Sequence, residues 1–305
     1  MIIIVKKMNS LFTPNKNGKI ALVISSYQPN KKSSQLLRIA IDSMLKFKPD
    51  YADIWVIDVG SPYSKYMVMP KEYSNVNFIF TDYTPRSSSE LSLKKRFYNK
   101  TFNIESPRNG SIASGWTLDF AIRSFNEIKY YPKYFFTLHM DIMFTNKNII
   151  PYMLSLFEKK TAAVGVLKQK NISKQYDILH SLGCLWNYDI LLKHNLLMET
   201  KFPKFDVGEF AIFQSINYGY SLKNLECSYN NMSLENNFSN KYKSLPGVDR
   251  SIDNEGNVIF MHLGRGVSKS EGLYWKNGKT TVEDWAHWFN SNILTQKDNH
   301  IENDD

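Results

Sequence analysis

Residues 135–145 read FFTLHMDIMFT and place two polar side chains, His139 and Asp141, inside an otherwise apolar segment. A buried carboxylate is costly unless it is paired, hydrogen-bonded or bound to a cation, so Asp141 needs a partner. Because side chains alternate along a strand, we expect His139 and Asp141 to share one face near the carboxyl edge of a sheet. A strand that ends in an ordinary polar turn gives the same pattern, so these residues alone leave both interpretations open.

The composition is that of an ordered globular protein. The 305 residues are 43% hydrophobic and 14% aromatic, which is enough to bury the core of one large domain or two small ones. The net charge of +9 suits an anionic partner such as a nucleic acid, a membrane surface or a phosphate-bearing substrate. The lysines are scattered and form no basic stripe, which argues against nucleic acid as the partner.

Cysteine usage and the N-terminus bear on the cellular compartment. Cys184 and Cys227 are the only cysteines and form no CxxC pair, so we expect neither a disulfide framework nor a cysteine zinc site. The start, MIIIVKKMNSLF, has the wrong order and length for a secretory signal, and no window resembles a membrane-spanning helix. We therefore expect a soluble, cytoplasmic protein in a reducing compartment, whose membrane contact, if any, is peripheral at the inner face.

Before residue 135, apolar runs alternate with helical patterns. The predicted strands are residues 19–26 (KIALVISS), 54–57 and 76–80 (VNFIF), and the strand that starts at Phe135 and ends at the His139 and Asp141 site is the fourth. Helical spacing of apolar residues predicts a helix over 33–47, capped by Ser33 or Ser34. A turn at 108–110, with Ser111 as the cap, opens a second helix. This alternation predicts a doubly wound α/β fold.

The second half of the chain continues the same mixture and ends in an amphipathic, tryptophan-containing tail. The predicted elements are a helix at 149–157, a strand at 162–166, an element followed by a short helix within 180–197, and strands at 222–227 and 258–263. Asp206 and Glu209 stand at the head of an amphipathic helix within 204–219 (KFDVGEFAIFQSINYG). Acidic residues at the start of a helix stabilise it by interacting with the helix dipole, even when they have no catalytic function.

Polar residues follow successive apolar runs, where a doubly wound sheet collects its site. In order they are SSYQ at 25–28, DVGS at 58–61, RNGSIASGWTLDFAI at 108–122 and HMD at 139–141. This order resembles glycosyltransferases of the GT-A fold, in particular the inverting family 2. In that family the first strand ends in a Pro-Thr-Tyr-Asn-like turn, the second in Asp-Asp-Gly-Ser, and a later strand in the metal-binding Asp-x-Asp motif. The resemblance covers about residues 19–145 and weakens afterwards.

The resemblance implies a role for each motif residue. The implied nucleotide-binding residues are Ser25, Ser26, Tyr27, Asp58, Arg108, Asn109 and Ser111. Asp141 would bind a divalent cation, Mn²⁺ or Mg²⁺, with His139 and the late-strand His262 of FMHLGRG as further ligands. Imidazole ligands would favour Mn²⁺. Asp206 or Glu209 would be the general base that takes a proton from the acceptor hydroxyl.

We therefore expect a GT-A-like doubly wound mixed sheet with a C-terminal extension, acting as a glycosyltransferase in glycan or surface polysaccharide synthesis. The expected division is a lead-in at 1–17, a domain at 18–293 and a tail at 294–305. Within the domain, 18–145 would bind the nucleotide sugar and 146–293 the acceptor. The expected partners are a nucleotide-sugar donor and a glycan, lipid-linked or protein acceptor.

Two departures from the family pattern leave alternatives open. Val59 stands where a second acidic residue is usual, and His139 stands in place of the first carboxylate of Asp-x-Asp. Both favour a degenerate, non-catalytic carbohydrate-binding member of the same fold. A sugar nucleotidyltransferase would instead need a glycine-rich basic loop after the first strand, where this chain has SSYQPNKKSS, with lysines but no glycine.

Overall fold

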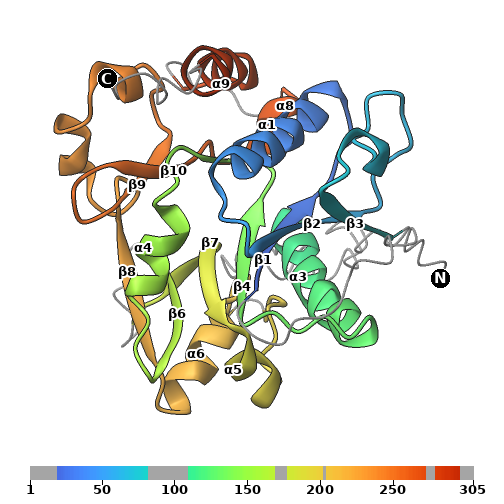
Figure 1. The fold of residues 1–305 in the computed structure, drawn as a ribbon, viewed down its shortest axis with the longest axis vertical. Coiled ribbons are helices and arrows are strands. Elements are labelled where there is room, and N and C mark those ends of the chain that lie inside the picture. Colours follow the sequence, from blue (N-terminus) through green and yellow to red (C-terminus); the bar gives the residue numbers. More distant parts are fainter. Residues whose placement is uncertain (1–18, 82–108, 169–176, 202–203, 273–278, 296–305) are drawn as a thin grey trace, which may run out of the picture.

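The structure is a computed structural model that describes residues 19–81, 109–168, 177–201, 204–272 and 279–295 (Figure 1). Within these residues ten strands form one mixed sheet in the order β3-β2-β1-β4-β7-β6-β8-β9-β10-β5. The strands are β1 (Ile20–Ser26), β2 (Ala52–Val59), β3 (Val76–Thr81), β4 (Tyr134–His139), β5 (Ile142–Phe144), β6 (Thr161–Leu167), β7 (Leu179–Asn187), β8 (Ser221–Cys227), β9 (Asp249–Ile252) and β10 (Val258–His262). The predicted α/β fold around a mixed sheet is confirmed.

Helices cover both faces of this sheet, as a doubly wound fold requires. They are α1 (Lys31–Phe47), α3 (Asn109–Glu127), α4 (Ile149–Ser155), α5 (Tyr188–Lys193), α6 (Glu209–Asn217), α7 (Asn240–Lys243), α8 (Gly266–Ser270) and α9 (Val282–Phe289), with short turns η1 (Pro70–Glu72), η3 (Met232–Asn236) and η4 (Asn290–Leu294). Leu22 of β1 is buried in one core with Leu36 of α1. Its neighbour Val23 is buried in the core on the other face, together with Leu118 of α3.

The parallel part of the sheet brings several predicted site residues to one edge. Strands β1, β2, β3 and β4 run parallel, so their carboxyl ends lie together. The register pairs Ser26 with Asp58 across β1 and β2, and Ser25 with His139 across β1 and β4. The structure thus places the ends of the first, second and fourth predicted strands side by side.

The predicted strand from Phe135 is present, but Asp141 lies just beyond its end. Strand β4 ends at His139, Met140 and Asp141 form a turn, and β5 begins at Ile142. Strand β5 leaves β4 and pairs antiparallel with β10, at the other end of the sheet order. An apolar run carries no signal for such a break, because the residues on both sides of the turn, 135–138 and 142–144, are buried and almost all hydrophobic.

Two predicted helix caps also differ from the structure. Helix α1 is capped by Asn30, whose side chain accepts the Ser33 N–H at 2.9 Å, and Ser33 Oγ accepts the Asn30 N–H at 3.1 Å. Ser33 therefore completes a capping box, and neither Ser33 nor Ser34 is the cap. Helix α3 begins at Asn109, so Ser111 lies inside its first turn.

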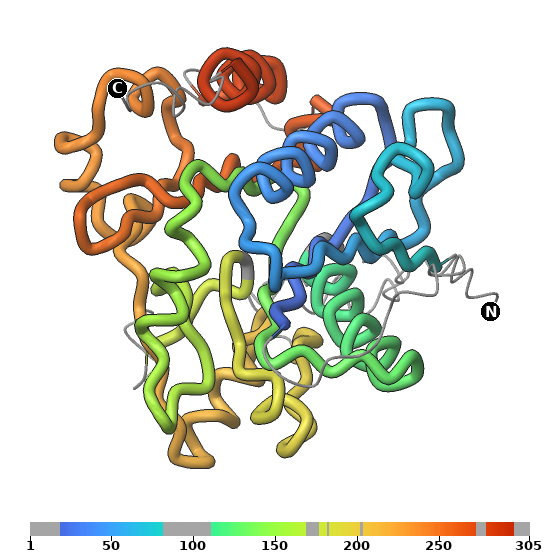
Figure 2. The backbone as a smooth tube through the Cα atoms, in the orientation of Figure 1, coloured from blue at the N-terminus to red at the C-terminus, as the bar shows by residue number. Residues whose placement is uncertain are grey.

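The C-terminal part of the described chain packs against its N-terminal part. Helix α9 lies beside α1 (Figure 2), with Trp285 of α9 fully buried. An ion pair of 2.6 Å joins Lys32 to Glu283, and Lys46 Nζ donates a hydrogen bond to the Ile293 carbonyl oxygen. The predicted packing of the amphipathic tail onto the domain is confirmed for these residues. Trp275 of that tail lies outside the described residues.

Within the described residues, the cysteines form no disulfide and no helix is suited to span a membrane. Cys184 and Cys227 are buried and carry free thiols. Among the described helices, none combines the length and the apolar character needed to cross a bilayer.

Candidate active site

Asp58, at the end of β2, is the centre of a buried polar network. Its Oδ2 accepts hydrogen bonds from Ser26 Oγ at 2.8 Å, Gln28 Nε2 at 2.9 Å and Ser61 Oγ at 2.8 Å. Gln28 Oε1 in turn accepts the Val68 N–H at 2.9 Å. Burial raises the pKa of Asp58 although all of these donors favour its charged form. The carboxyl group therefore ties the β1, β2 and 61–68 segments together.

The other predicted nucleotide-binding residues are placed unequally. Ser25 is half-buried at the end of β1, and the following Tyr27 is 38% exposed. Ser111 is half-buried in the first turn of α3. Arg108 and the side chain of Asn109 lie outside what the structure describes. Binding of a nucleotide by Ser25, Ser26, Tyr27 and Asp58 stays a prediction, as it does for the α3 residues.

Asp141 and His262 meet although they come from distant parts of the sequence. Asp141 is only 4% exposed, and its Oδ1 lies 3.6 Å from His262 Nε2. Its Oδ2 accepts the Gly266 N–H at 2.8 Å, and its backbone carbonyl accepts the Leu263 N–H at 3.0 Å. Burial alone would raise the pKa of Asp141, but the imidazoles of His262 and His139 and the Gly266 N–H together lower it. The partner that a buried Asp141 requires is therefore present.

A second carboxylate, which the sequence did not single out, lies behind His262. The Oδ2 atom of Asp249 is 3.2 Å from His262 Nδ1, and the two residues are paired across β9 and β10. Burial opposes a charge on His262, but Asp141 and Asp249 outweigh it and raise its pKa above the usual value. His262 thus lies between two carboxylates, one at each ring nitrogen.

Two further imidazoles adjoin this group. His139 at the end of β4 has a buried Nε2 with no hydrogen-bond partner among the described residues, and burial lowers its pKa to about 4. His180 on β7 has its ring centroid 5.9 Å from that of His262, and burial lowers the pKa of His180 to about 3. Both are neutral at physiological pH. No pattern in the sequence indicates a role for His180, because a histidine in an apolar strand is often a core residue.

These residues fit a cation in part. Among the described residues, no group of three or more His, Cys, Asp or Glu side chains converges on one position. The 3.6 Å between Asp141 Oδ1 and His262 Nε2 nevertheless allows both atoms to lie about 2.1 Å from a single ion. The unpartnered Nε2 of His139 is a further nitrogen donor nearby. Mg²⁺ sites are commonly built from one or two protein ligands plus substrate phosphates, so a two-ligand site suffices.

The predicted base residues form a separate ion cluster at the start of α6. Lys168 Nζ, just after β6, lies 2.8 Å from Glu209 Oε1 and 3.3 Å from Asp206 Oδ2. Glu209 is 4% exposed, and its Oε2 accepts the Asp206 N–H at 3.1 Å. Burial would lower the pKa of Lys168, but Glu209 and Asp206 outweigh it and raise the pKa of this ammonium group. Asp206 is the more accessible acid, with 34% of its side chain exposed.

Strand β7 connects the two clusters. His180 neighbours His262 on one side, and the charge of Lys168 adds to the lowering of the pKa of His180 on the other. The next residue, Ser181, packs against Gly208, whose positive φ of 70° lets the chain turn into α6. A Cβ atom on Gly208 would lie 3.0 Å from Ser181 Cβ, which shows how closely α6 approaches β7. His180 therefore interacts both with His262 and with the lysine of the Asp206 and Glu209 cluster.

Comparison with known proteins gives no sequence match and several partial structural ones. No protein-family model matches the chain, and no curated protein matches its sequence. The mannosyltransferase PcManGT from Pyrobaculum calidifontis, solved with GDP-Man and Mn²⁺, is 10% identical over 70% of this chain and 56% of its own, with a TM-score of 0.44. The bifunctional glycosyltransferase WbbM is 13% identical over 70% of this chain and 40% of its own, with a TM-score of 0.41.

Residues 1–349 of TarS from S. aureus, solved with UDP-GlcNAc, are 10% identical over 65% of this chain and 54% of their own, with a TM-score of 0.37. The chain spans about half the length of these solved structures. Two of the three are glycosyltransferases, and the third holds a nucleotide sugar.

Proposed function

We propose that this protein is a glycosyltransferase that moves a sugar from a nucleotide-sugar donor to an acceptor hydroxyl. The observation that carries the proposal is the meeting of Asp141 with His262, 3.6 Å apart, next to His139 at the shared carboxyl edge of β1, β2 and β4. Ligands of α/β sheets bind at that edge. A carboxylate and an imidazole there, with a second acidic cluster adjoining, suit a diphosphate leaving group and an attacking hydroxyl.

A divalent cation is part of the proposal. Asp141 and His262 would hold it, because their facing atoms can both reach one ion, and His139 offers the additional nitrogen. When bound, Mn²⁺ or Mg²⁺ offsets the negative charge that develops on the departing nucleoside diphosphate. The mixture of oxygen and nitrogen donors favours Mn²⁺. Burial of Asp141 keeps water from competing for its oxygens.

Of the two acidic candidates, Asp206 is the one we assign as the general base. Both acids accept hydrogen bonds at both carboxylate oxygens: Glu209 from Lys168 and the Asp206 N–H, and Asp206 from Lys168 and the Val207 N–H. They differ in exposure, because Glu209 is only 4% exposed. Asp206 has a third of its side chain exposed and so can meet an acceptor hydroxyl. It would take the hydroxyl proton as that oxygen attacks the anomeric carbon, in a single inverting displacement. Glu209 then serves to hold Asp206 and Lys168 in place.

The test is release of nucleoside diphosphate by the purified full-length chain from a panel of UDP-, GDP- and other nucleotide sugars, with Mn²⁺ or with EDTA. Asp141→Ala should abolish the Mn²⁺-dependent release, and Asp206→Asn should lower kcat about 100-fold or more. Asp189→Asn, an exposed position in α5, removes the same charge and should leave release unchanged. The proposal is overturned if no donor is turned over and none shifts the thermal unfolding midpoint.

A second candidate is a binding member of the same fold without catalysis. The specific observations in its favour are His139 in place of a carboxylate and the complete engagement of Asp58 Oδ2 by three donors of the chain itself. A nucleotide-induced thermal shift without turnover would select this candidate. The acceptor, a glycan, lipid-linked or protein hydroxyl, and the cytoplasmic location stay predictions.

A further inference from the structure

We propose that Asp249 is a positioning residue that fixes the ring of His262 so that Nε2 faces Asp141. Its Oδ2 lies 3.2 Å from His262 Nδ1, while His262 Nε2 lies 3.6 Å from Asp141 Oδ1. The imidazole is thus held from behind by one carboxylate and presented to another. The functional consequence rests on the proposed cation at Asp141, whereas the orientation of the ring does not.

The strand register makes this arrangement a property of the backbone. His262, the last residue of β10, is paired with Asp249, the first residue of β9, and with Ile142, the first residue of β5. Asp141 directly precedes Ile142. Asp249 and His262 are therefore paired on adjacent strands, and Asp141 lies in the turn directly before the β5 residue that is paired with His262. A shift of one residue in either pairing would turn the side chains to opposite faces of the sheet.

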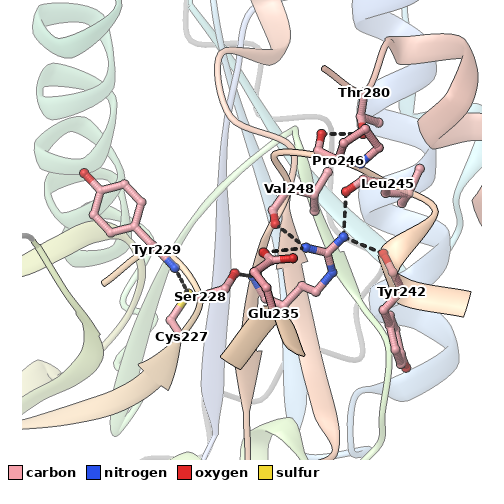
Figure 3. A network of polar contacts seen from close by, with 10 residues as sticks. Cys227, Ser228, Tyr229, Glu235, Tyr242, Leu245, Pro246, Val248 and Thr280 are labelled. Carbon is pink, nitrogen blue, oxygen red and sulfur yellow. Dashed lines mark hydrogen bonds and ion pairs between the residues drawn. The ribbon is translucent and has the colours of Figure 1, made fainter. Parts of the chain in front are cut away.

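Arg250, the residue after Asp249 in β9, is buried and is the centre of a polar network (Figure 3). The Arg250 guanidinium is fully buried and donates to the carbonyl oxygens of Val248 at 2.7 Å and Leu245 at 2.6 Å, and to Glu235 Oε1 at 3.1 Å. Its backbone N–H donates to Ser228 Oγ at 3.0 Å. The residues on both sides of Asp249 are therefore anchored, so its carboxylate has little freedom to leave His262.

The chemistry of an imidazole ligand explains what Asp249 contributes. A neutral imidazole carries one proton, and a carboxylate at Nδ1 places it there. The Nε2 lone pair is then free to face a cation shared with Asp141, and the carboxylate makes this nitrogen a stronger donor. Without Asp249 the proton could occupy Nε2, where it would meet Asp141 and close the site to an ion. Loss of such a supporting carboxylate typically weakens metal binding about 10–100-fold.

Two measurements test the role of Asp249 separately from activity. The tautomer of His262 in the metal-free full chain is read from ¹⁵N-histidine NMR spectra at pH 9, with His262→Gln to assign the signal. We expect the Nδ1–H form in the wild type and loss of that preference in Asp249→Asn and in Asp249→Ser. Mn²⁺ affinity, measured by electron paramagnetic resonance of the free ion, should fall about 10–100-fold in both variants.

Glu226→Gln is the matched control, because Glu226 is an exposed residue of β8 paired in register with β9. It removes one negative charge from the same part of the sheet and should leave tautomer and affinity unchanged. Asp249 variants with the wild-type tautomer, or with the wild-type Mn²⁺ affinity, overturn the inference. If the wild type binds no Mn²⁺, the cation of the proposed function is refuted, and the tautomer alone decides the role of Asp249.

Discussion

Gly266 is the position where a single methyl group should test the geometry of the site most directly. Its N–H donates to Asp141 Oδ2 at 2.8 Å, so the two residues are in close contact. A Cβ atom at this position would lie 2.6 Å from Asp141 Cβ and 2.9 Å from Asp141 Oδ2, distances that real Cβ atoms do not show. Gly266→Ala therefore requires Asp141 or the 264–266 turn to move.

The size of this movement follows from the contact distances. Ordinary contact begins at 3.4 Å, so the closest pair of atoms must separate by about 0.8 Å. Metal ligands tolerate displacements of only about 0.2 Å, so the Asp141 oxygens would leave a cation shared with His262. We expect Mn²⁺ affinity to fall at least about tenfold and nucleoside diphosphate release about 100-fold. Overpacking should also lower the free energy of unfolding by about 1–3 kcal/mol.

Gly115→Ala is the control that separates the site effect from the stability effect. A Cβ on Gly115 would lie 2.8 Å from the Met198 carbonyl oxygen and 2.9 Å from Glu199 Cα, so this variant is overpacked to a similar degree in α3. Urea unfolding and Mn²⁺ titration of both variants give the comparison. The reasoning fails if Gly266→Ala keeps the wild-type Mn²⁺ affinity, or if Gly115→Ala loses as much affinity as Gly266→Ala.

Three other predictions concern stability and cation binding. Arg250→Met leaves buried acceptors without a donor and should lower the free energy of unfolding, measured in urea, by about 3–5 kcal/mol. Arg38→Met, at a partly exposed ion pair, should lower it by only about 0–1 kcal/mol. Equal losses in the two variants would contradict this prediction. Burial raises the pKa of Asp119 to about 6 in the folded state. Between about pH 4 and pH 6 the folded state therefore keeps a proton that the unfolded state has lost. The free energy of unfolding should fall by about 1–3 kcal/mol as the pH rises through that window. Asp119→Asn should flatten this part of the urea-derived stability curve, and an unchanged slope would refute the assignment. His139→Asp should lower the thermal unfolding midpoint of the metal-free chain, because a buried carboxylate costs more free energy than a neutral imidazole. Adding Mn²⁺ should raise the midpoint of this variant by more than it raises that of the wild type. A smaller rise would argue against a cation beside Asp141.

The parallel half of the fold could be predicted from the sequence because its signals are local. Continuous apolar runs mark β1, β2 and β3 as buried strands, and each is followed by polar residues. Parallel strands bring those polar ends to one edge, which places Ser26, Asp58 and His139 together without further information. The Asn30 cap was also visible in principle, since asparagine is a preferred residue at that position.

The antiparallel half depends on contacts that no local pattern encodes. Strand β9 reads DRSI and looks like a polar loop, because Arg250 is buried by a network and not by hydrophobicity. Its partners β8 and β10 create the strand. Asp249 could not be assigned to the site before β9 was known to lie beside β10. His180 and Lys168 were missed for the same reason, since each gains a role only from neighbours distant in sequence.

The turn at Met140 and Asp141 has a consequence for how the protein is made. Strands β4 and β5 are separated in sequence by only this turn, yet five strands lie between them in the sheet order. Strand β5 finds its partner β10 only once residues up to 262 have left the ribosome. Asp141 is synthesised well before His262 and stays without it until then. The site is therefore completed late in biosynthesis, by the same strand pairing that adds β5 to the end of the sheet, and a chain that stops before β10 would lack both.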